Sequence, residues 1–104
     1  MAEWVDAGLE KDCPQGHRMV VDTDAGNIAI FHLSQGFYAI EDRCSHDNGE
    51  LASGKCDGDE IICPRHGARF CLRNGKALTP PAYEDIQTYP VRIHHGMIQI
   101  DIDV

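Results

Sequence analysis

The chain has 104 residues, of which 42% are hydrophobic, so it is long enough for one domain with a modest core. Its 9 basic and 17 acidic side chains give a formal net charge of −8, which argues against nucleic acid and favours partners with basic docking surfaces. The first residues contain neither a basic cluster nor an apolar run, and the five cysteines lack the spacing of a disulfide framework. We therefore expect no signal peptide, no membrane segment and a cytoplasmic location.

The first part of the chain is predicted to form short strands. Apolar runs bounded by turn residues favour strands over residues 3–6, 17–22, 27–33 and 37–40, with Trp4 as a core anchor. Glycine-containing turns separate the last three of these strands, which predicts a hairpin. The second arm of this hairpin leads directly into a segment rich in cysteine and histidine.

The second part of the chain continues in the same way. Strands are expected over residues 60–62, 69–72, 89–94 and 97–103. In the last strand isoleucines alternate with polar residues, so one face should be buried and the other should face water. Pro80 and Pro81 exclude a central strand in their segment, and no segment has a helical period. Many short strands predict an all-β fold, either an antiparallel β-sandwich or a small barrel.

Two motifs in the middle of the chain each combine one cysteine with one histidine. Cys44 and His46 form a C-x-H pair, and after 16 intervening residues Cys63 and His66 form a C-x-x-H pair. Two thiolates and two imidazoles are the ligand set of a Rieske [2Fe-2S] centre, in which the thiolates hold one iron and the imidazoles hold the other. A turn at residues 57–59 would return the chain, so that the two loops lie side by side.

Other interpretations of these four residues remain open from the residues alone. Two cysteines and two histidines could bind a single structural zinc ion, although the short C-x-H pair suits zinc less well. The four residues could also be a chance cluster of unrelated buried cysteines and histidines. A disulfide between Cys44 and Cys63 is disfavoured, because nothing marks the chain as secreted.

Further segments between Ile40 and Ile93 match a known pattern around the two motifs. They are Cys44-Ser45-His46, Cys63-Pro64-Arg65-His66-Gly67, Arg69-Phe70-Cys71, Gly75-Lys76, Ala77-Leu78-Thr79-Pro80-Pro81 and Tyr89-Pro90-Val91-Arg92-Ile93. With these segments the chain resembles the Rieske-type ferredoxins of bacterial multicomponent aromatic-ring dioxygenases. The resemblance implies a single Rieske domain over residues 1–104, with an inserted cluster-binding subdomain at about residues 43–82.

The resemblance also implies a ligand set and a function. Cys44 and Cys63 would hold a buried iron, His46 and His66 would hold an outer iron, and the loop at 80–81 would shield the single [2Fe-2S] cluster. The protein would be a soluble, monomeric one-electron carrier rather than an enzyme. Electrons would arrive from an NAD(P)H-dependent flavoprotein reductase and leave for a terminal oxygenase. The alternatives are a Rieske-like small subunit of a larger reductase, such as nitrite reductase, or a carrier for a non-catabolic oxygenase.

The chain departs from the respiratory Rieske proteins at four positions. Gly49 and Arg65 stand where those proteins carry two further cysteines joined as a disulfide, and Ala68 and Phe70 stand where they carry hydroxyl groups that donate to sulfur. Fewer donors to sulfur should lower the reduction potential toward the bottom of the roughly −150 to +300 mV Rieske range. The positive charge of Arg65 would oppose this shift if it points toward the cluster.

Three cysteines and four histidines remain outside the motifs. We expect Cys71 to be a small core residue, and Cys56 and Cys13 to be exposed, oxidisable thiols. The remaining histidines are expected on the surface: His17, His32, His94 and His95.

Overall fold

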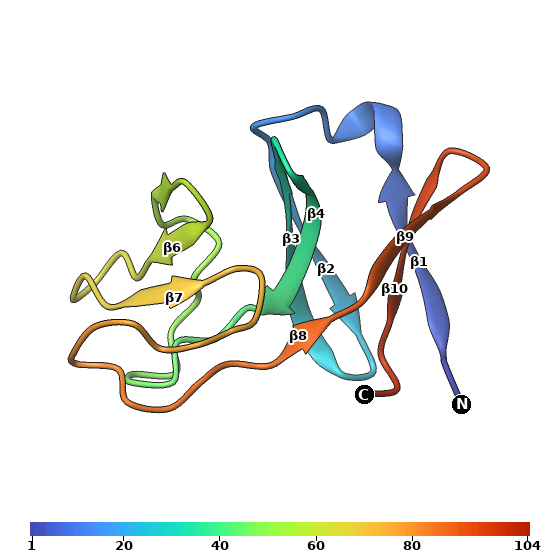
Figure 1. Cartoon of the computed structure of the whole chain (residues 1–104). Helices are drawn as coiled ribbons and strands as arrows, with labels where there is room; N and C mark the ends of the chain where they lie inside the picture. The colour runs from blue at the N-terminus through green and yellow to red at the C-terminus, as the bar shows by residue number, and fades with distance from the viewer.

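The computed structural model describes residues 1–104 and is all-β (Figure 1). Its elements are β1 (Trp4–Leu9), the short 3-10 helix η1 (Glu10–Asp12), β2 (Arg18–Thr23), β3 (Gly26–Leu33), β4 (Gly36–Glu41), β5 (Cys56–Asp57), β6 (Glu60–Ile62), β7 (Arg69–Cys71), β8 (Thr88–Tyr89), β9 (Val91–His94) and β10 (Met97–Asp101). The all-β prediction is therefore confirmed. The structure contains no helix that is long and apolar enough to cross a membrane.

The strands form three antiparallel sheets. Their orders are β1-β10-β9, β2-β3-β4-β8 and β5-β6-β7. Figure 1 shows the first two sheets together on the right and the small third sheet projecting on the left, with both termini on the side away from it. The chain passes from β4 into the third sheet and returns through a long loop to β8, which pairs with β4.

Strand β3 lies at the centre of the molecule because both of its faces are buried. Ile28 and Ile30 pack with Ile98 and Ile100 of β10 in a core between the two larger sheets. The alternate side chains of β3, Ala29 and Phe31, belong to a second core that extends under the third sheet. A strand with two buried faces requires a continuous apolar run. Because its two faces belong to different cores, β3 connects the base of the fold, formed by the two larger sheets, to the small lobe around the third sheet.

The strand predicted over residues 89–94 is divided at Pro90, and the prediction was wrong there. Thr88–Tyr89 pairs with β4, whereas Val91–His94 pairs with β10 in the other sheet. Proline has no N–H to donate to a ladder, so it marks the point at which the chain leaves one sheet for the next. The carbonyl of Pro90 still accepts a hydrogen bond of 3.0 Å from the N–H of Asp101.

The alternation predicted for the last strand holds for Ile98 and Ile100 but fails at Asp101. Asp101 is only 9% exposed, because its carboxylate accepts hydrogen bonds from the N–H groups of Glu3 (2.8 Å) and Asp103 (3.0 Å). It thereby holds the two terminal segments together. Trp4, predicted as a core anchor, is half-buried beneath the guanidinium of Arg92, whose Cζ lies 4.1 Å from the ring centroid.

Of the three cysteines outside the motifs, Cys71 is buried, as predicted. Cys13 is 1% exposed and packs in the core between the two larger sheets, so the prediction of an exposed thiol was wrong. Cys56 is half-buried beside Arg18, whose guanidinium lies 3.4 Å from the sulfur.

Candidate metal centre

The two loops that carry the motifs have the same backbone frame. The N–H of Cys44 donates to the carbonyl of Gly49 (2.7 Å), and the N–H of Cys63 donates to the carbonyl of Ala68 (2.7 Å). In each loop the residue four positions after the cysteine donates back to the cysteine carbonyl and has a positive φ, 63° at Asn48 and 75° at Gly67. These are left-handed positions, which glycine and asparagine tolerate best. The first of these loops follows β4, and the second connects β6 to β7.

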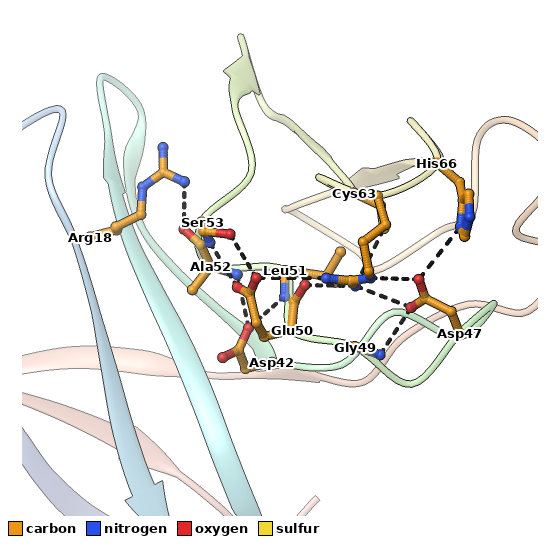
Figure 2. A network of polar contacts seen from close by, with 11 residues as sticks. Arg18, Asp42, Asp47, Gly49, Glu50, Leu51, Ala52, Ser53, Cys63 and His66 are labelled. Carbon is orange, nitrogen blue, oxygen red and sulfur yellow. Dashed lines mark hydrogen bonds and ion pairs between the residues drawn. The ribbon is translucent and has the colours of Figure 1, made fainter.

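Two side chains fix the chain beyond the first loop. The carboxylate of Asp42 accepts hydrogen bonds from the N–H groups of Leu51 (2.8 Å) and Ala52 (2.9 Å). From the other side Arg18 of β2 donates to the carbonyl groups of Ala52 (2.8 Å) and Gly54. Figure 2 shows Asp42 and Arg18 reaching this segment from separate parts of the base. The small lobe is therefore attached by polar contacts as well as by its apolar core.

The folded chain brings the four predicted ligands to one end of the small lobe. The sulfurs of Cys44 and Cys63 lie in one group of donors, within 4.8 Å of each other and of an Asp47 oxygen. The ring nitrogens of His46 and His66 form a second group around Asp47, also within 4.8 Å. Cys44 and Cys63 are 0% and 1% exposed, whereas both histidines are exposed, with ring centroids 5.1 Å apart.

This division of donors fits a two-iron cluster better than one zinc ion. A tetrahedral zinc ion at bonds of roughly 2.0 to 2.3 Å would draw all four donor atoms into one group. The structure instead holds the two thiols in one group and the two imidazoles in another, and Asp47 is the residue that the groups share. Sulfur on the buried side and nitrogen on the exposed side is the arrangement expected for a Rieske centre.

Opposing effects act on the pKa of the Cys44 thiol, and the net effect is to raise it. Burial raises the pKa of Cys44, while the N–H groups of His46 and Asp47 point at its sulfur and act in the opposite direction. The neighbouring thiol of Cys63 raises the pKa further. Two buried thiols in contact therefore favour the protonated form until a metal cation supplies positive charge.

Two charged residues of the site, Asp47 and Arg65, were not predicted to interact. Arg65 donates from Nε to Asp47 Oδ2 (2.5 Å), from Nη2 to Asp47 Oδ1 (3.1 Å) and from Nη2 to the Glu50 carbonyl (2.8 Å). The hydrogen bond to Arg65 holds the pKa of Asp47 well below its usual range, and Asp47 raises the pKa of Arg65. Both are therefore charged at neutral pH. Figure 2 shows Asp47 between Gly49 and His66, with dashed lines to both.

A third loop between β7 and β8 covers the site from the remaining side. It contains Pro80 and Pro81, joined by a cis peptide bond. Its residues Ala82 and Ile86 are 4% exposed and pack in the same core as the two predicted ligand cysteines. The hydroxyl of Ser45 in the first ligand loop donates to the carbonyl of Glu84 (2.5 Å), which joins the loops directly.

Comparison with known proteins agrees with this architecture. The profile of the Rieske [2Fe-2S] domain matches residues 3–90, which is most of the chain. The chain belongs to the Rieske [2Fe-2S] domain family, and its cofactor is accordingly a Rieske-type [2Fe-2S] cluster.

Relatives and solved structures narrow the class further. The ferredoxin subunit of 3-phenylpropionate/cinnamic acid dioxygenase from Escherichia coli (strain K12) is 45% identical over 92 residues, covering 88% of this chain and 86% of that protein. The ferredoxin of Sphingomonas yanoikuyae B1 superposes with a TM-score of 0.86 at 28% identity, covering 95% of this chain and 98% of that one. A chain from the complex of reduced oxygenase and oxidized ferredoxin in carbazole 1,9a-dioxygenase gives a TM-score of 0.87 at 27% identity, covering 94% and 92%. The chain is thus an electron carrier of the ferredoxin type and not a catalytic subunit.

Proposed function

We propose that Cys44, Cys63, His46 and His66 hold the cluster, and that the chain carries single electrons to a terminal oxygenase that hydroxylates aromatic rings. The observation that carries this proposal is the separation of two buried thiols from two exposed imidazoles at one tip of the fold. When bound, the cluster accepts and returns one electron.

The chain's own residues divide the work of an electron carrier. The buried pair, Cys44 and Cys63, lies in an apolar core that excludes water from the sulfur side. The exposed pair, His46 and His66, presents ring edges where a partner can approach. Hydrogen-bonded loops hold both pairs in place, and a fixed ligand frame reduces the rearrangement that accompanies a change of charge.

The partners in this proposal are a flavoprotein reductase that uses NAD(P)H and the oxygenase itself. The curated relative is named as a subunit of an aromatic-acid dioxygenase, and the carbazole structure is titled a complex of oxygenase and ferredoxin. With a net charge of −8, the chain is suited to basic docking surfaces and to association rates that fall with salt. We further propose that the chain acts as a cytoplasmic monomer, with one Rieske domain over residues 1–104 and a cluster-binding subdomain at about residues 43–82.

Spectroscopy of the purified protein tests the ligand set. The wild-type chain should contain iron and acid-labile sulfide in equal amounts and give the visible and EPR spectra of mixed Cys/His ligation. His46→Ala and His66→Ala should abolish these spectra, whereas His94→Ala, at the exposed end of β9, should retain them. Native spectra after either ligand change would refute the ligand assignment, and a colourless zinc protein would refute the cofactor and the function together.

Reconstitution tests the physiological role. The chain should restore NAD(P)H-dependent oxygenation when it is added to a reductase and an aromatic-ring oxygenase, and the rate should fall as ionic strength rises. A chain that has Rieske spectra but remains in a stoichiometric complex with a large reductase would instead favour the role of a small reductase subunit.

A further inference from the structure

Arg65 lies between two proposed ligands, and its guanidinium is turned toward the site. Three of its hydrogen bonds reach the first ligand loop, two at the carboxylate of Asp47 and one at the carbonyl of Glu50. A contact of 3.6 Å with the Glu50 carboxylate adds to them. Since Arg65 itself belongs to the second loop, one side chain spans the gap between the two loops.

The same guanidinium also reaches a proposed ligand. Nη2 lies 3.5 Å from the sulfur of Cys63, within the range of an N–H···S hydrogen bond. The hydroxyl donors that the sequence lacks at Ala68 and Phe70 are thus partly replaced by a charged donor from another direction. A positive charge that donates to a ligand sulfur stabilises the added electron.

Gly49 makes room for this arrangement. A Cβ at Gly49 would lie 2.3 Å from Cζ and 2.4 Å from Nη2 of Arg65, so no other residue fits while the guanidinium stays in place. The φ of Gly49 is not positive, so its backbone would accept alanine and the obstacle is the guanidinium alone. Gly49 and Arg65, which stand where respiratory Rieske proteins carry a disulfide, are therefore packed against each other here.

We propose that Arg65 is a positioning residue that clasps the two ligand loops through Asp47 and Glu50 and raises the reduction potential through its N–H toward Cys63. Asp47 has the opposite electrostatic effect, because its carboxylate lies beside both donor groups and disfavours added negative charge. The inference rests on the proposed ligand set. It predicts that the two members of one ion pair shift the potential in opposite directions.

Two substitutions separate this role from a purely structural one. Arg65→Gln removes the charge and the donor fork, so the potential should fall. Asp47→Asn removes the opposing negative charge and weakens the contacts of this side chain with Arg65, Gly49 and His66. The Glu50 carbonyl still accepts from the guanidinium, so the positive charge stays near Cys63 and the potential should rise. Both variants should lose iron to a chelator roughly 10- to 100-fold faster than the wild type, as expected when support of the ligands is weakened.

Three further variants serve as an independent perturbation, a rescue and a control. Gly49→Ala displaces the guanidinium while leaving Arg65 intact, so it should lower the potential as Arg65→Gln does. Arg65→Lys keeps the charge and should retain most of the potential while losing the fork-shaped contact. Arg73→Gln removes a cation of the same lobe that pairs with Asp59 (2.6 Å) instead of with a ligand loop, and should change neither quantity.

The reduction potential is measured by voltammetry and iron loss by chelation. Potentials of Arg65→Gln and Asp47→Asn that move in the same direction, or a shift in Arg65→Gln no larger than in Arg73→Gln, would overturn the role of Arg65. If Arg65→Gln does not load, Gly49→Ala and Asp47→Asn decide the question by the same criterion. A wild-type protein without Rieske spectra would refute the ligand set itself, which is a different result from Rieske spectra with unchanged potentials.

Discussion

Replacing Gly75 by alanine should loosen the loop that covers the site. Gly75 lies in the turn after β7 with φ at 77°, and its carbonyl accepts the N–H of Ile86 at 2.8 Å. A Cβ at this position would lie 2.0 Å from the carbonyl oxygen of Ile86 and 3.1 Å from Cγ2 of Thr88. The close approach joins the start of the third loop to its end, and only a residue without a side chain permits it.

The size of the effect follows from two contributions. A left-handed alanine costs about 1 to 2 kcal/mol, and this cost applies at any glycine with a positive φ. Because Cβ atoms do not approach within 3.0 Å, the Ile86 carbonyl would also have to recede from its 2.0 Å position. That displacement weakens one hydrogen bond, about 1 kcal/mol, and part of the packing of the Ile86 side chain, roughly 1 to 2 kcal/mol.

Gly58→Ala is the matched control for this substitution. Gly58 also has a positive φ, at 61°, but a Cβ there would meet nothing within 4 Å. The difference between the two variants isolates the steric part, about 2 to 3 kcal/mol, which at a slope of about 1.5 kcal/mol/M corresponds to about 1.3 to 2 M in urea midpoint. Unfolding of the loaded proteins by urea, followed by circular dichroism without oxygen, measures it. Equal midpoints for Gly75→Ala and Gly58→Ala would refute the reasoning.

The remaining predictions concern other buried positions. Phe70→Tyr should raise the reduction potential by about 40 mV, because Phe70 is buried in the same core as both proposed ligand sulfurs and a hydroxyl donor there is worth about 1 kcal/mol. An unchanged potential in voltammetry would contradict the donor explanation. Burial raises the pKa of Cys56, so its alkylation should be slow near neutral pH and accelerate only as the pH approaches that raised pKa. Mass spectrometry can follow the alkylation, and a fast reaction at pH 7 would contradict the prediction. Cys13→Ser should destabilise the fold by about 1 to 3 kcal/mol by placing a hydroxyl in an apolar core, and a urea midpoint equal to that of the wild type would show that Cys13 is not buried in solution.

The sequence was most informative about features that a single chain segment determines, such as the position of a strand or a short ligand motif. Alternation and turn residues located most of the strands, and the double burial of β3 explains why its apolar run was continuous. The four proposed ligands could be selected because cysteine and histidine at short spacing form a specific pattern. Their division into a buried sulfur pair and an exposed nitrogen pair followed from the resemblance, and the structure has the same burial.

The errors arose where distant segments meet. Pro90 was read as part of one strand, but the chain changes sheets there, and this depends on which edges β4 and β10 offer. Asp101 was placed in water because alternation takes no account of the N–H groups that a terminal segment brings to it. No local pattern predicts these partners.

The contact between Asp47 and Arg65 was beyond sequence reasoning for the same reason. Asp47 directly follows His46 and Arg65 directly precedes His66, so opposite charges beside the two proposed ligand histidines were a usable signal. Whether the side chains meet depends on how closely the loops pack, and the absence of a side chain at Gly49 becomes meaningful only once that packing is known.

The one-sided exposure of the ligands has a kinetic consequence for the proposed shuttle. Cys44 and Cys63 are buried, so the imidazole rings of His46 and His66 are the only part of the proposed ligand set that a partner protein can contact. The reductase and the oxygenase would then have to bind the same surface in turn, so an excess of either protein should slow turnover by occupying that surface. The rate of electron transfer through this carrier is therefore expected to be highest at an intermediate ratio of the two partners.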